Sequence, residues 1–492
     1  MSGSVEIDLA SQARMIDALR ISLRATQVLQ THLSYVVLTG GIAYKVKKAV
    51  DLGFLDFRSL ASRRRDCDRE LRIDRAFAPD LYLDVVAVTG SVDTPHIGGA
   101  GPVLDYAVRM REFPQEAVAA HALARGAIGP AWVDALAANI ADAHLRAAVD
   151  TTRADAPCVL GYAERTIERL SGSPLDRERV DALLAWTRAQ HTTIAGTIER
   201  RRAAGCVRAC HGDLHLGNIV SIGGKPTAFD AIAFDDDLRI IDVMSDVAFL
   251  VMDFRFRGRR DLGSRFLDRY LAITGDYEGL AVLRFYAVYR ALVRAMVACE
   301  RARQGNVQDD PVAEAARYVE LAQDFATPPA ATLVVTHGLS GSGKTTGSQP
   351  MLERQGAIRV RTDVERKRLH RMHTTERGPE SLYAEGATRA VYLRARDIAR
   401  IALSAGFPVI VDGTFLRRWQ RTLFADLADE LGVRLSIASF ECPIDVLRDR
   451  VAERAARGDD ASDADLAVLD AQIRSREPLD ARERACVVAT SA

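Results

Sequence analysis

The chain has 492 residues, enough for two to four domains, and its 48% hydrophobic content is ordinary for globular protein. Its 66 basic and 66 acidic residues give a formal net charge of zero, so no general attraction to nucleic acid is expected. The sequence contains no apolar run of 18 residues and no signal-peptide pattern, so neither a membrane span nor secretion is expected. Seven scattered cysteines indicate reduced thiols and predict a cytoplasmic location.

Lysine is rare in this chain, because only six of the 66 basic residues are lysines: Lys45, Lys47, Lys48, Lys225, Lys344 and Lys367. Three of them lie in one short predicted strand, and one lies in a glycine loop. A lysine ammonium is a compact point charge that the rigid fork of arginine cannot replace beside a phosphate. Both places are therefore candidates for holding the phosphates of ATP.

The first two hundred residues are predicted to contain both strands and helices up to residue 113, and helices after it. Strand alternation places Lys45 and Lys47 on one face, so either lysine could serve; we favour Lys45. Apolar periodicity predicts one or two helices over 5–35, a hairpin over 34–48, a charged helix over 59–76, strands over 80–89 and 104–113, and alanine-rich helices over 115–150, 161–172 and 176–204.

The most informative stretch is His211-Gly-Asp-Leu-His-Leu-Gly-Asn218, with Phe229-Asp230 eleven residues further on. Transfer of a phosphoryl group from ATP to a hydroxyl needs one carboxylate for the proton, and an amide and a second carboxylate for Mg²⁺. Asp213, Asn218 and Asp230 supply these groups in that order. Cys206 and Cys210 flank the motif, but their spacing fits no zinc pattern, so buried thiols are expected.

This set resembles the aminoglycoside phosphotransferase and choline-kinase branch of the protein-kinase-like fold. The resemblance implies that Asp213 positions the acceptor hydroxyl, while Asn218 and Asp230 hold Mg²⁺. It also implies that Lys45 binds the phosphates of ATP and pairs with an acidic residue on the following helix, for which Glu70 is the candidate. Asp246, before an apolar helical run, resembles the carboxylate that braces the catalytic loop in this family.

A second motif follows helical segments over 243–305 and 311–325 and a linker at 325–332. Gly338-x-x-x-x-Gly343-Lys344-Thr345 comes after a β-run and before a helical stretch, which is the context of a Walker A loop. Backbone N–H groups in such a loop cradle phosphates, Lys344 reaches the β and γ positions, and Thr345 ligates Mg²⁺. The residues predicted to bind nucleotide here are Gly338, Ser340, Gly341, Ser342, Gly343, Lys344, Thr345 and Thr346.

Two later strands are each predicted to end in a carboxylate, Asp363 after 357–362 and Asp412 after 407–411. Open α/β sheets bind ligands at the carboxyl ends of their strands, so Asp412, which is Walker-B-like, is predicted to hold Mg²⁺ through water. This part resembles small-molecule P-loop kinases and zeta-toxin-like proteins, which implies that Asp363 orients an acceptor hydroxyl, with Arg366 nearby. In the same resemblance, residues 447–458 form a lid helix whose Arg454 and Arg457 close over the phosphates. Further strands are predicted over 433–440 and 484–489.

These features predict a multidomain α+β and α/β protein. Residues 1–326 are expected to form a bilobal protein-kinase-like domain, with an N-lobe over about 1–112 and a C-lobe over about 113–326. Residues 331–492 are expected to form a P-loop NTPase domain with a parallel sheet.

The predicted function is an ATP-dependent phosphotransferase with two Mg-ATP sites, acting on hydroxyl groups of small-molecule acceptors, with no nucleic-acid or membrane partner. One alternative is that one domain is a nucleotide sensor for the other, since the first lacks a Gly-x-Gly-x-x-Gly loop and the second ends soon after its last strand. Another is a polynucleotide 5′-kinase, suggested by Arg359-Val-Arg361 and the basic run 366–373. Zero net charge and the lack of interleaved aromatic residues oppose it.

Overall fold

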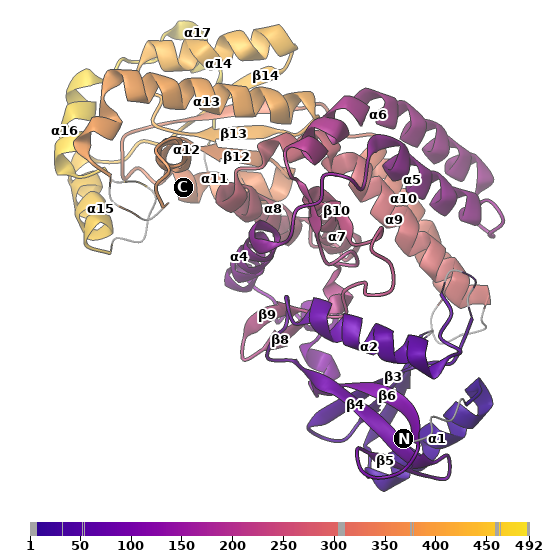
Figure 1. The fold of residues 1–492 in the computed structure, drawn as a ribbon. Coiled ribbons are helices and arrows are strands. Elements are labelled where there is room, and N and C mark those ends of the chain that lie inside the picture. The colour runs from indigo at the N-terminus through magenta and orange to yellow at the C-terminus, as the bar shows by residue number, and fades with distance from the viewer. Residues whose placement is uncertain are drawn as a thin grey trace. The chain divides into compact units, whose positions relative to one another are not determined.

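The computed structural model describes residues 7–31, 33–51, 53, 55–303, 310–373, 376, 378–457, 462 and 464–489. The chain divides into two compact units, one formed by Met1–Ala154 with Arg202–Asp246 and the other by Asp155–Arg201 with Val247–Ala492. Figure 1 follows the chain through both. The predicted division near residues 326–331 stays a prediction. No helix among the described residues has both the length and the apolar character to cross a membrane.

The first unit contains an antiparallel sheet in the order β1-β2-β3-β6-β4-β5. Its strands are β1 Gln27–Gln30, β2 Ser34–Leu38, β3 Ile42–Lys47, β4 Tyr82–Ser91, β5 Thr94–Ile97 and β6 Val103–Arg111. The predicted hairpin is confirmed, with Val36 opposite Lys45. The expected helical content of 5–35 is wrong in its second half, because β1 adds to the sheet edge by pairing Val28 with Val37. This pairing overrides the helical spacing of the apolar residues.

Two helices of the first unit, α1 Leu9–Ser22 and α2 Leu60–Asp74, are tied to the sheet through a buried carboxylate. Arg63 of α2 donates through Nε to Asp105 Oδ1 at 2.8 Å, and Gln12 of α1 donates through Nε2 to Asp105 Oδ2 at 2.6 Å. The side chains of Arg63 and Asp105 are fully buried. One charged group on β6 therefore fixes both helices, and α2 in turn carries Glu70 to β3.

Short strands frame the motif residues of the first unit. Strand β7 pairs with β10, and β8 pairs with β9, both antiparallel. The remaining elements of this unit are α3 Ala119–Ala124, α4 Pro130–Arg146, β7 Val207–Ala209, β8 Ile219–Ile222, β9 Lys225–Ala228 and β10 Ile240–Asp242. The motif 211–218 lies between β7 and β8, and Asp230 follows the end of β9, so strand ends position all three predicted catalytic groups.

The second unit contains helices and a parallel sheet in the order β12-β13-β11-β14-β15. The sheet strands are β11 Thr332–His337, β12 Ile358–Arg361, β13 Val409–Asp412, β14 Arg434–Ser439 and β15 Val487–Val488. The predicted strand over 484–489 is correct only at β15, because Asp480 and Glu483 form a capping box that starts a helix before it. Two helices cross the boundary between the units, α6 Arg177–Ala203 at Arg201 and α7 Val243–Phe256 at Asp246. The other helices of this unit are α5 Ala156–Leu170, α8 Arg260–Thr274, α9 Leu280–Arg303, α10 Pro311–Ala326, α11 Lys344–Gln355, α12 Thr362–Leu369, α13 Glu385–Ser404, α14 Arg418–Leu431, α15 Ile444–Arg457, α16 Leu466–Ser475 and α17 Ala481–Ala485.

The buried ion pair of the first unit gives a stability prediction. Asp105→Ala should lower the free energy of opening of the β6 and α2 amides by about 3–5 kcal/mol, because it leaves the Arg63 guanidinium buried without its counter-charge. Hydrogen exchange read by mass spectrometry measures this locally. Asp84→Ala, which breaks the partly exposed pair with Arg109 in the same sheet, is the control and should change it by less than about 1 kcal/mol. Equal effects of the two substitutions would contradict this account of the pair.

Candidate active sites

The segment 211–218 is held in place by the carboxylate of Asp246. Its Oδ2 accepts the backbone N–H of His211 at 2.8 Å, and its Oδ1 accepts that of Gly212 at 3.0 Å. Asp246 is fully buried in the first turn of α7, so these charge-assisted hydrogen bonds are shielded from water. Gly212 has a φ of +85°, and a Cβ there would lie 2.7 Å from the carbonyl oxygen of Leu238. The brace predicted for Asp246 is present, and the second position of the motif requires glycine.

The side chain of His211 joins this loop to the segment that carries Asp230. Its Nε2 donates to the carbonyl oxygen of Phe229 at 3.0 Å, while its Nδ1 accepts the backbone N–H of Asp213 at 3.3 Å. A ring with one donor and one acceptor nitrogen is neutral. Burial lowers the pKa of His211, which favours the same state. The imidazole is therefore an uncharged link between two parts of the site.

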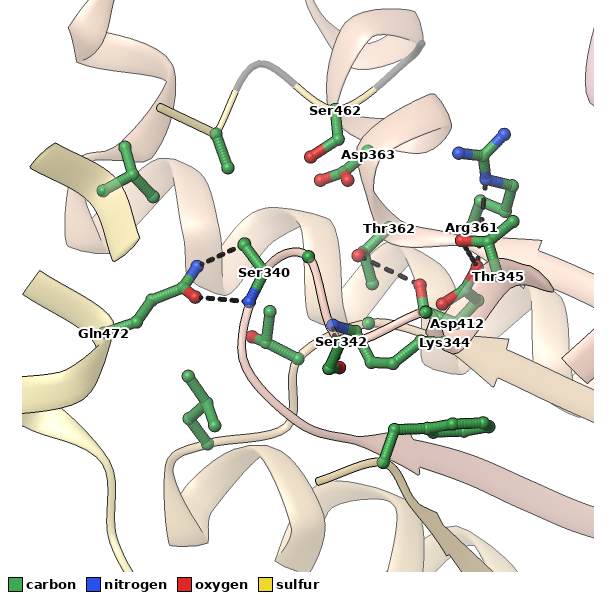
Figure 2. Close-up of a pocket in the computed structure, with 18 of the residues that line it drawn as sticks. Ser340, Ser342, Lys344, Thr345, Arg361, Thr362, Asp363, Asp412, Ser462 and Gln472 are labelled. Atoms are coloured by element: carbon green, nitrogen blue, oxygen red, sulfur yellow. Dashed lines mark hydrogen bonds and ion pairs between the residues drawn. The ribbon is translucent and has the colours of Figure 1, made fainter. Parts of the chain in front are cut away.

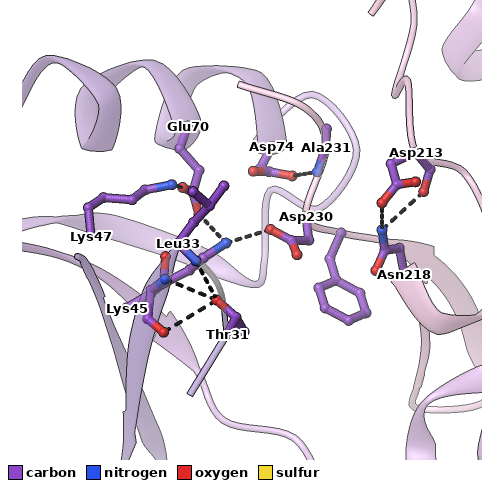
Figure 3. A network of polar contacts seen from close by, with 12 residues as sticks. Thr31, Leu33, Lys45, Lys47, Glu70, Asp74, Asp213, Asn218, Asp230 and Ala231 are labelled. Carbon is purple, nitrogen blue, oxygen red and sulfur yellow. Dashed lines mark hydrogen bonds and ion pairs between the residues drawn. The ribbon is translucent and has the colours of Figure 1, made fainter. Parts of the chain in front are cut away.

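Asp213 and Asn218 are hydrogen bonded to each other, as Figure 3 shows. Nδ2 of Asn218 donates to the carbonyl oxygen of Asp213 at 3.0 Å and to its Oδ2 at 2.9 Å. Because the amide nitrogen is used in this way, the amide oxygen is the atom left for a cation. The N–H of Phe229 donates to the carbonyl oxygen of Asn218 at 2.9 Å, which keeps Asn218 beside the residue before Asp230. The Asp213 side chain is 36% exposed, so an incoming hydroxyl can reach it.

Both lysines of β3 contact the carboxylate of Glu70 on α2 (Figure 3). Lys45 Nζ lies 2.9 Å from Glu70 Oε1 and 2.5 Å from Asp230 Oδ1, whereas Lys47 Nζ lies 2.9 Å from Asp66 Oδ2. Burial opposes charge on these groups, but Asp230 and Glu70 raise the pKa of Lys45 well above its ordinary value. Burial acts to raise the pKa of Glu70, but Lys45 and Lys47 lower it to about 2. Lys45 is thus the lysine that reaches the predicted metal ligand.

The backbone around Asp230 is held by two residues that the sequence did not single out. Asp230 has a φ of +62°, a left-handed conformation that is uncommon outside glycine. Its N–H donates to Tyr82 Oη at 3.0 Å, and the N–H of Ala231 donates to Asp74 Oδ1 at 2.8 Å. Burial and the charges of Glu70 and Asp230 raise the pKa of Asp74 well above its ordinary value, although the hydrogen bond from Ala231 acts in the opposite direction. The position of Asp74, one helical turn after Glu70, was the available sequence signal.

The second candidate site is a cavity of about 1620 Å³ beyond the carboxyl ends of β11, β12 and β13. The glycine loop runs along it, as Figure 2 shows. Gly338 shapes this loop, because its φ is +147° and a Cβ there would lie 2.5 Å from the carbonyl oxygen of Phe440. The predicted residues that line the cavity are Ser340, Gly341, Ser342, Gly343, Lys344, Thr345, Thr346, Asp363, Asp412 and Arg454.

Lys344 is folded back against its own loop. Its Nζ donates to the carbonyl oxygen of Leu339 at 2.7 Å and lies 3.5 Å from Ser342 Oγ. Burial lowers the pKa of Lys344 to about 8, even though Asp412 and Asp363 act in the opposite direction. The oxygen atoms that this ammonium group contacts in the loop are therefore uncharged.

Thr345 and Asp412 meet at the head of the loop. The hydroxyl of Thr345 donates to Asp412 Oδ2 at 2.6 Å, and the hydroxyl of Thr362 donates to the Asp412 carbonyl oxygen at 3.1 Å. Arg361 Nε lies 3.9 Å from the same Oδ2. The predicted pair of oxygen ligands is thus already assembled, and a hydroxyl with a carboxylate is a donor set that suits Mg²⁺.

The acceptor side of the cavity contains Asp363, in the first turn of α12. Arg366 also lines it, donates to the carbonyl oxygen of Leu382 at 2.7 Å and lies 4.7 Å from the ring centre of Tyr383. Arg454 donates to the carbonyl oxygen of Ala464 at 3.0 Å. The side chain of Arg457 lies outside the described residues. The roles assigned to these groups stay predictions.

Gln472 is a site residue that sequence reasoning missed. Its Oε1 accepts the backbone N–H of Ser340 at 2.9 Å, and its Nε2 donates to Ser340 Oγ at 3.0 Å (Figure 2). The two residues are 132 positions apart, and no local motif marks a glutamine on a short helix. Helix α16 therefore orients the glycine loop through a contact that only the fold reveals.

Among the described residues, one buried group has metal-ligand chemistry outside these sites. Ligand atoms of His144, Cys210 and Asp246 lie within 4.8 Å of one another. This group contains Cys210, whereas Cys206 and His211, which lie near Cys210 in the sequence, are not part of it. Because the carboxylate of Asp246 already accepts two backbone N–H groups, we infer that its role is to hold the loop 211–218 in place.

Two family models match this chain over most of its length. The model of the phosphotransferase enzyme family matches residues 35–286, and that of an AAA domain matches residues 333–479. Uncharacterised proteins of Mycobacterium tuberculosis (strain H37Rv) and Mycobacterium bovis are each 32% identical over 468 residues, covering 90% of this chain and 89% of the relative.

Solved structures are matched at low identity and low TM-score. A choline/ethanolamine kinase family protein from Mesorhizobium loti has a TM-score of 0.41 at 14% identity, covering 64% of this chain and 96% of its own. The APS kinase of Mycobacterium tuberculosis has a TM-score of 0.22 at 21% identity, covering 27% of this chain and 72% of its own. By its family matches and relatives, the chain belongs to the phosphotransferase enzyme family and is a phosphotransferase that also carries a P-loop kinase-like domain.

Proposed function

We propose that this protein is an ATP-dependent phosphotransferase with two Mg-ATP sites, which phosphorylates hydroxyl groups of small-molecule acceptors. The observation that carries the proposal is that each site has its own lysine, its own oxygen ligands and its own accessible carboxylate. In the first these are Lys45, Asn218 with Asp230, and Asp213. In the second they are Lys344, Thr345 with Asp412, and Asp363.

In the first site, the residues present fit a magnesium ion, because a carboxylate and an amide oxygen are hard ligands. Bound Mg²⁺ would neutralise charge on the phosphates, with Asn218 and Asp230 as its ligands. Lys45, which pairs with Asp230, would then be available to the phosphates, with Glu70 still holding it. Asp213 accepts the proton of the acceptor hydroxyl, and Asn218 orients its carboxylate.

In the second site, the glycine loop supplies backbone N–H groups, and Lys344 turns from Leu339 to the phosphates. Thr345 and Asp412 would hold Mg²⁺. Asp363 receives the hydroxyl proton. Arg366 and Tyr383 line the same cavity and would contact a small acceptor there.

The polynucleotide-kinase alternative has less support. Of its two basic stretches, Arg359 and Lys367 are buried. Arg359 pairs with Asp268, and Arg368 donates to the carbonyl oxygen of Ala272 at 2.7 Å. Basic groups engaged inside the protein are poorly placed to follow a phosphate backbone.

Single substitutions at the two sites test whether both transfer phosphate. Asp213→Ala and Lys344→Ala should each remove part of the ADP formed from ATP, slowing the affected site by about 10²–10⁴-fold, and the double variant should remove nearly all of it. A coupled ADP assay with a panel of small alcohols measures turnover, and calorimetry with a non-hydrolysable ATP analogue counts sites. Asp142→Ala and Lys225→Ala, at exposed positions, are matched controls.

Two bound nucleotides with turnover lost in only one single variant would favour the sensor alternative. Unchanged turnover in both single variants would exclude the two-site proposal.

The pKa of Lys344 predicts how nucleotide affinity at the second site depends on pH. A bound triphosphate favours the charged lysine, so its pKa rises from about 8 on binding. Below pH 8 the lysine is already charged; above it, binding must take up a proton, and the apparent Kd should rise roughly tenfold per pH unit. Calorimetry between pH 7 and 9.5, with the first site disabled by Asp230→Asn, measures this slope. Lys344→Arg should flatten it, and an unchanged slope in that variant would assign the dependence to another group.

A further inference from the structure

Helix α8 lies within residues 35–286, which match the phosphotransferase family, yet it packs against elements of the P-loop domain. It lies beside α11, the helix that starts at Lys344, and beside β12 (Figure 1). All three elements belong to the second compact unit. A segment of one family therefore forms part of the surroundings of the other family's nucleotide loop.

Arg359 of β12 connects α8 to that loop. Its Nη2 donates to Asp268 Oδ2 of α8 at 2.8 Å, and its Nη1 donates to the carbonyl oxygen of Thr345 at 3.1 Å. Arg359 is 8% exposed, and the Asp268 side chain is 12% exposed. The hydroxyl of the same Thr345 donates to Asp412. An unbroken series of contacts thus runs from α8 to both predicted Mg²⁺ ligands.

Both ends of α8 are also anchored to the P-loop domain. At its start, Arg260 donates to the carbonyl oxygen of Gln355, the last residue of α11, at 2.7 Å. At its end, Arg368 of α12 donates to the carbonyl oxygen of Ala272 at 2.7 Å, where helix carbonyls lack intrahelical partners. In between, Arg265 lies 3.3 Å from Glu353 of α11. Anchors at three levels fix the position of Asp268 relative to Arg359.

We propose that α8 is a built-in part of the P-loop nucleotide site and that Asp268 is a positioning residue for Thr345, acting through Arg359. Asp268 sets the direction of the Arg359 guanidinium, whose other nitrogen holds the backbone of Thr345. The hydroxyl of Thr345 and the carboxylate of Asp412 are thereby kept together for Mg²⁺. Residues that orient metal ligands in this way change metal affinity although they never touch the ion.

The inference rests on the proposed second Mg-ATP site, and the test keeps the two claims apart. The full chain with the first site disabled by Asp230→Asn is the parent, and calorimetry measures its Mg-ATP affinity over a series of Mg²⁺ concentrations. If the parent shows no binding that depends on Lys344, the proposed function fails. If the parent does show binding that depends on Lys344, the effect of substituting Asp268 on that binding can be measured.

Asp268→Ala in this parent should weaken Mg-ATP binding at the second site by about 10-fold or more and raise the Mg²⁺ concentration needed for it. Asp268→Asn, which keeps an oxygen acceptor for Arg359, should lose less. The loss from Asp268→Ala should largely disappear when Arg359→Met is already present, because Asp268 acts through that guanidinium. Asp261→Ala is the matched control: the same substitution on the same helix breaks a pair with Arg259 and should leave binding unchanged.

If Asp268 only stabilised the packing of α8, Asp268→Ala would lower the melting temperature. The protein that remains folded would then bind Mg-ATP with the parent's dependence on Mg²⁺. The proposal is overturned if Asp268→Ala and Asp268→Asn both retain the parent's Mg-ATP affinity and Mg²⁺ requirement. It is equally overturned if Asp261→Ala weakens binding as much as Asp268→Ala does.

Discussion

A buried ammonium group keeps its proton more readily beside a carboxylate than beside neutral oxygen atoms, and the two candidate sites differ in this respect. Lys45 lies against Glu70 and Asp230, which raise its pKa well above the ordinary value despite burial. Lys344 contacts the carbonyl oxygen of Leu339, and burial lowers its pKa to about 8. On the proposed function, Mg²⁺ would have to free the cation of the first site from Asp230, whereas a triphosphate would stabilise the cation of the second site.

The loop that carries Asp213 and the loop that carries Lys344 are each held by a side chain from outside the loop. Asp246 takes two consecutive N–H groups of the first loop, and Gln472 takes an N–H group of the second. Each acceptor comes from a helix far away in the sequence, so the loop geometry depends on tertiary packing. Preorganisation of this kind is where phosphoryl transfer gains most of its rate, because such sites supply little beyond position and charge.

Whether a contact could be predicted from the sequence depended on how many residues separate its two partners. Asp213 with Asn218, and Gly343 with Lys344, are separated by a few residues, so local spacing alone indicated their chemistry. The pairing of Lys45 with Glu70 needed the family resemblance, and the structure places them 2.9 Å apart.

Tyr82, Asp74 and Gln472 could not be found in this way. Their partners lie 148, 157 and 132 positions away, and a tyrosine, an aspartate or a glutamine on an ordinary element carries no distinguishing pattern. Similarly, β1 was misjudged because its strand character comes from pairing with β2.

Lysine and arginine have different roles in this chain, and this difference explains why so few lysines suffice. Arg63, Arg201 and Arg421 are almost fully buried, and each donates to a carboxylate while joining separate elements. A guanidinium has five donors in a fixed plane, so it can hold two partners at once, as Arg359 holds Asp268 and Thr345. A lysine has one rotatable ammonium group and can exchange its partner. Many fixed connections among the described residues are therefore made by arginine, and the two cations proposed to reach a phosphate are lysines.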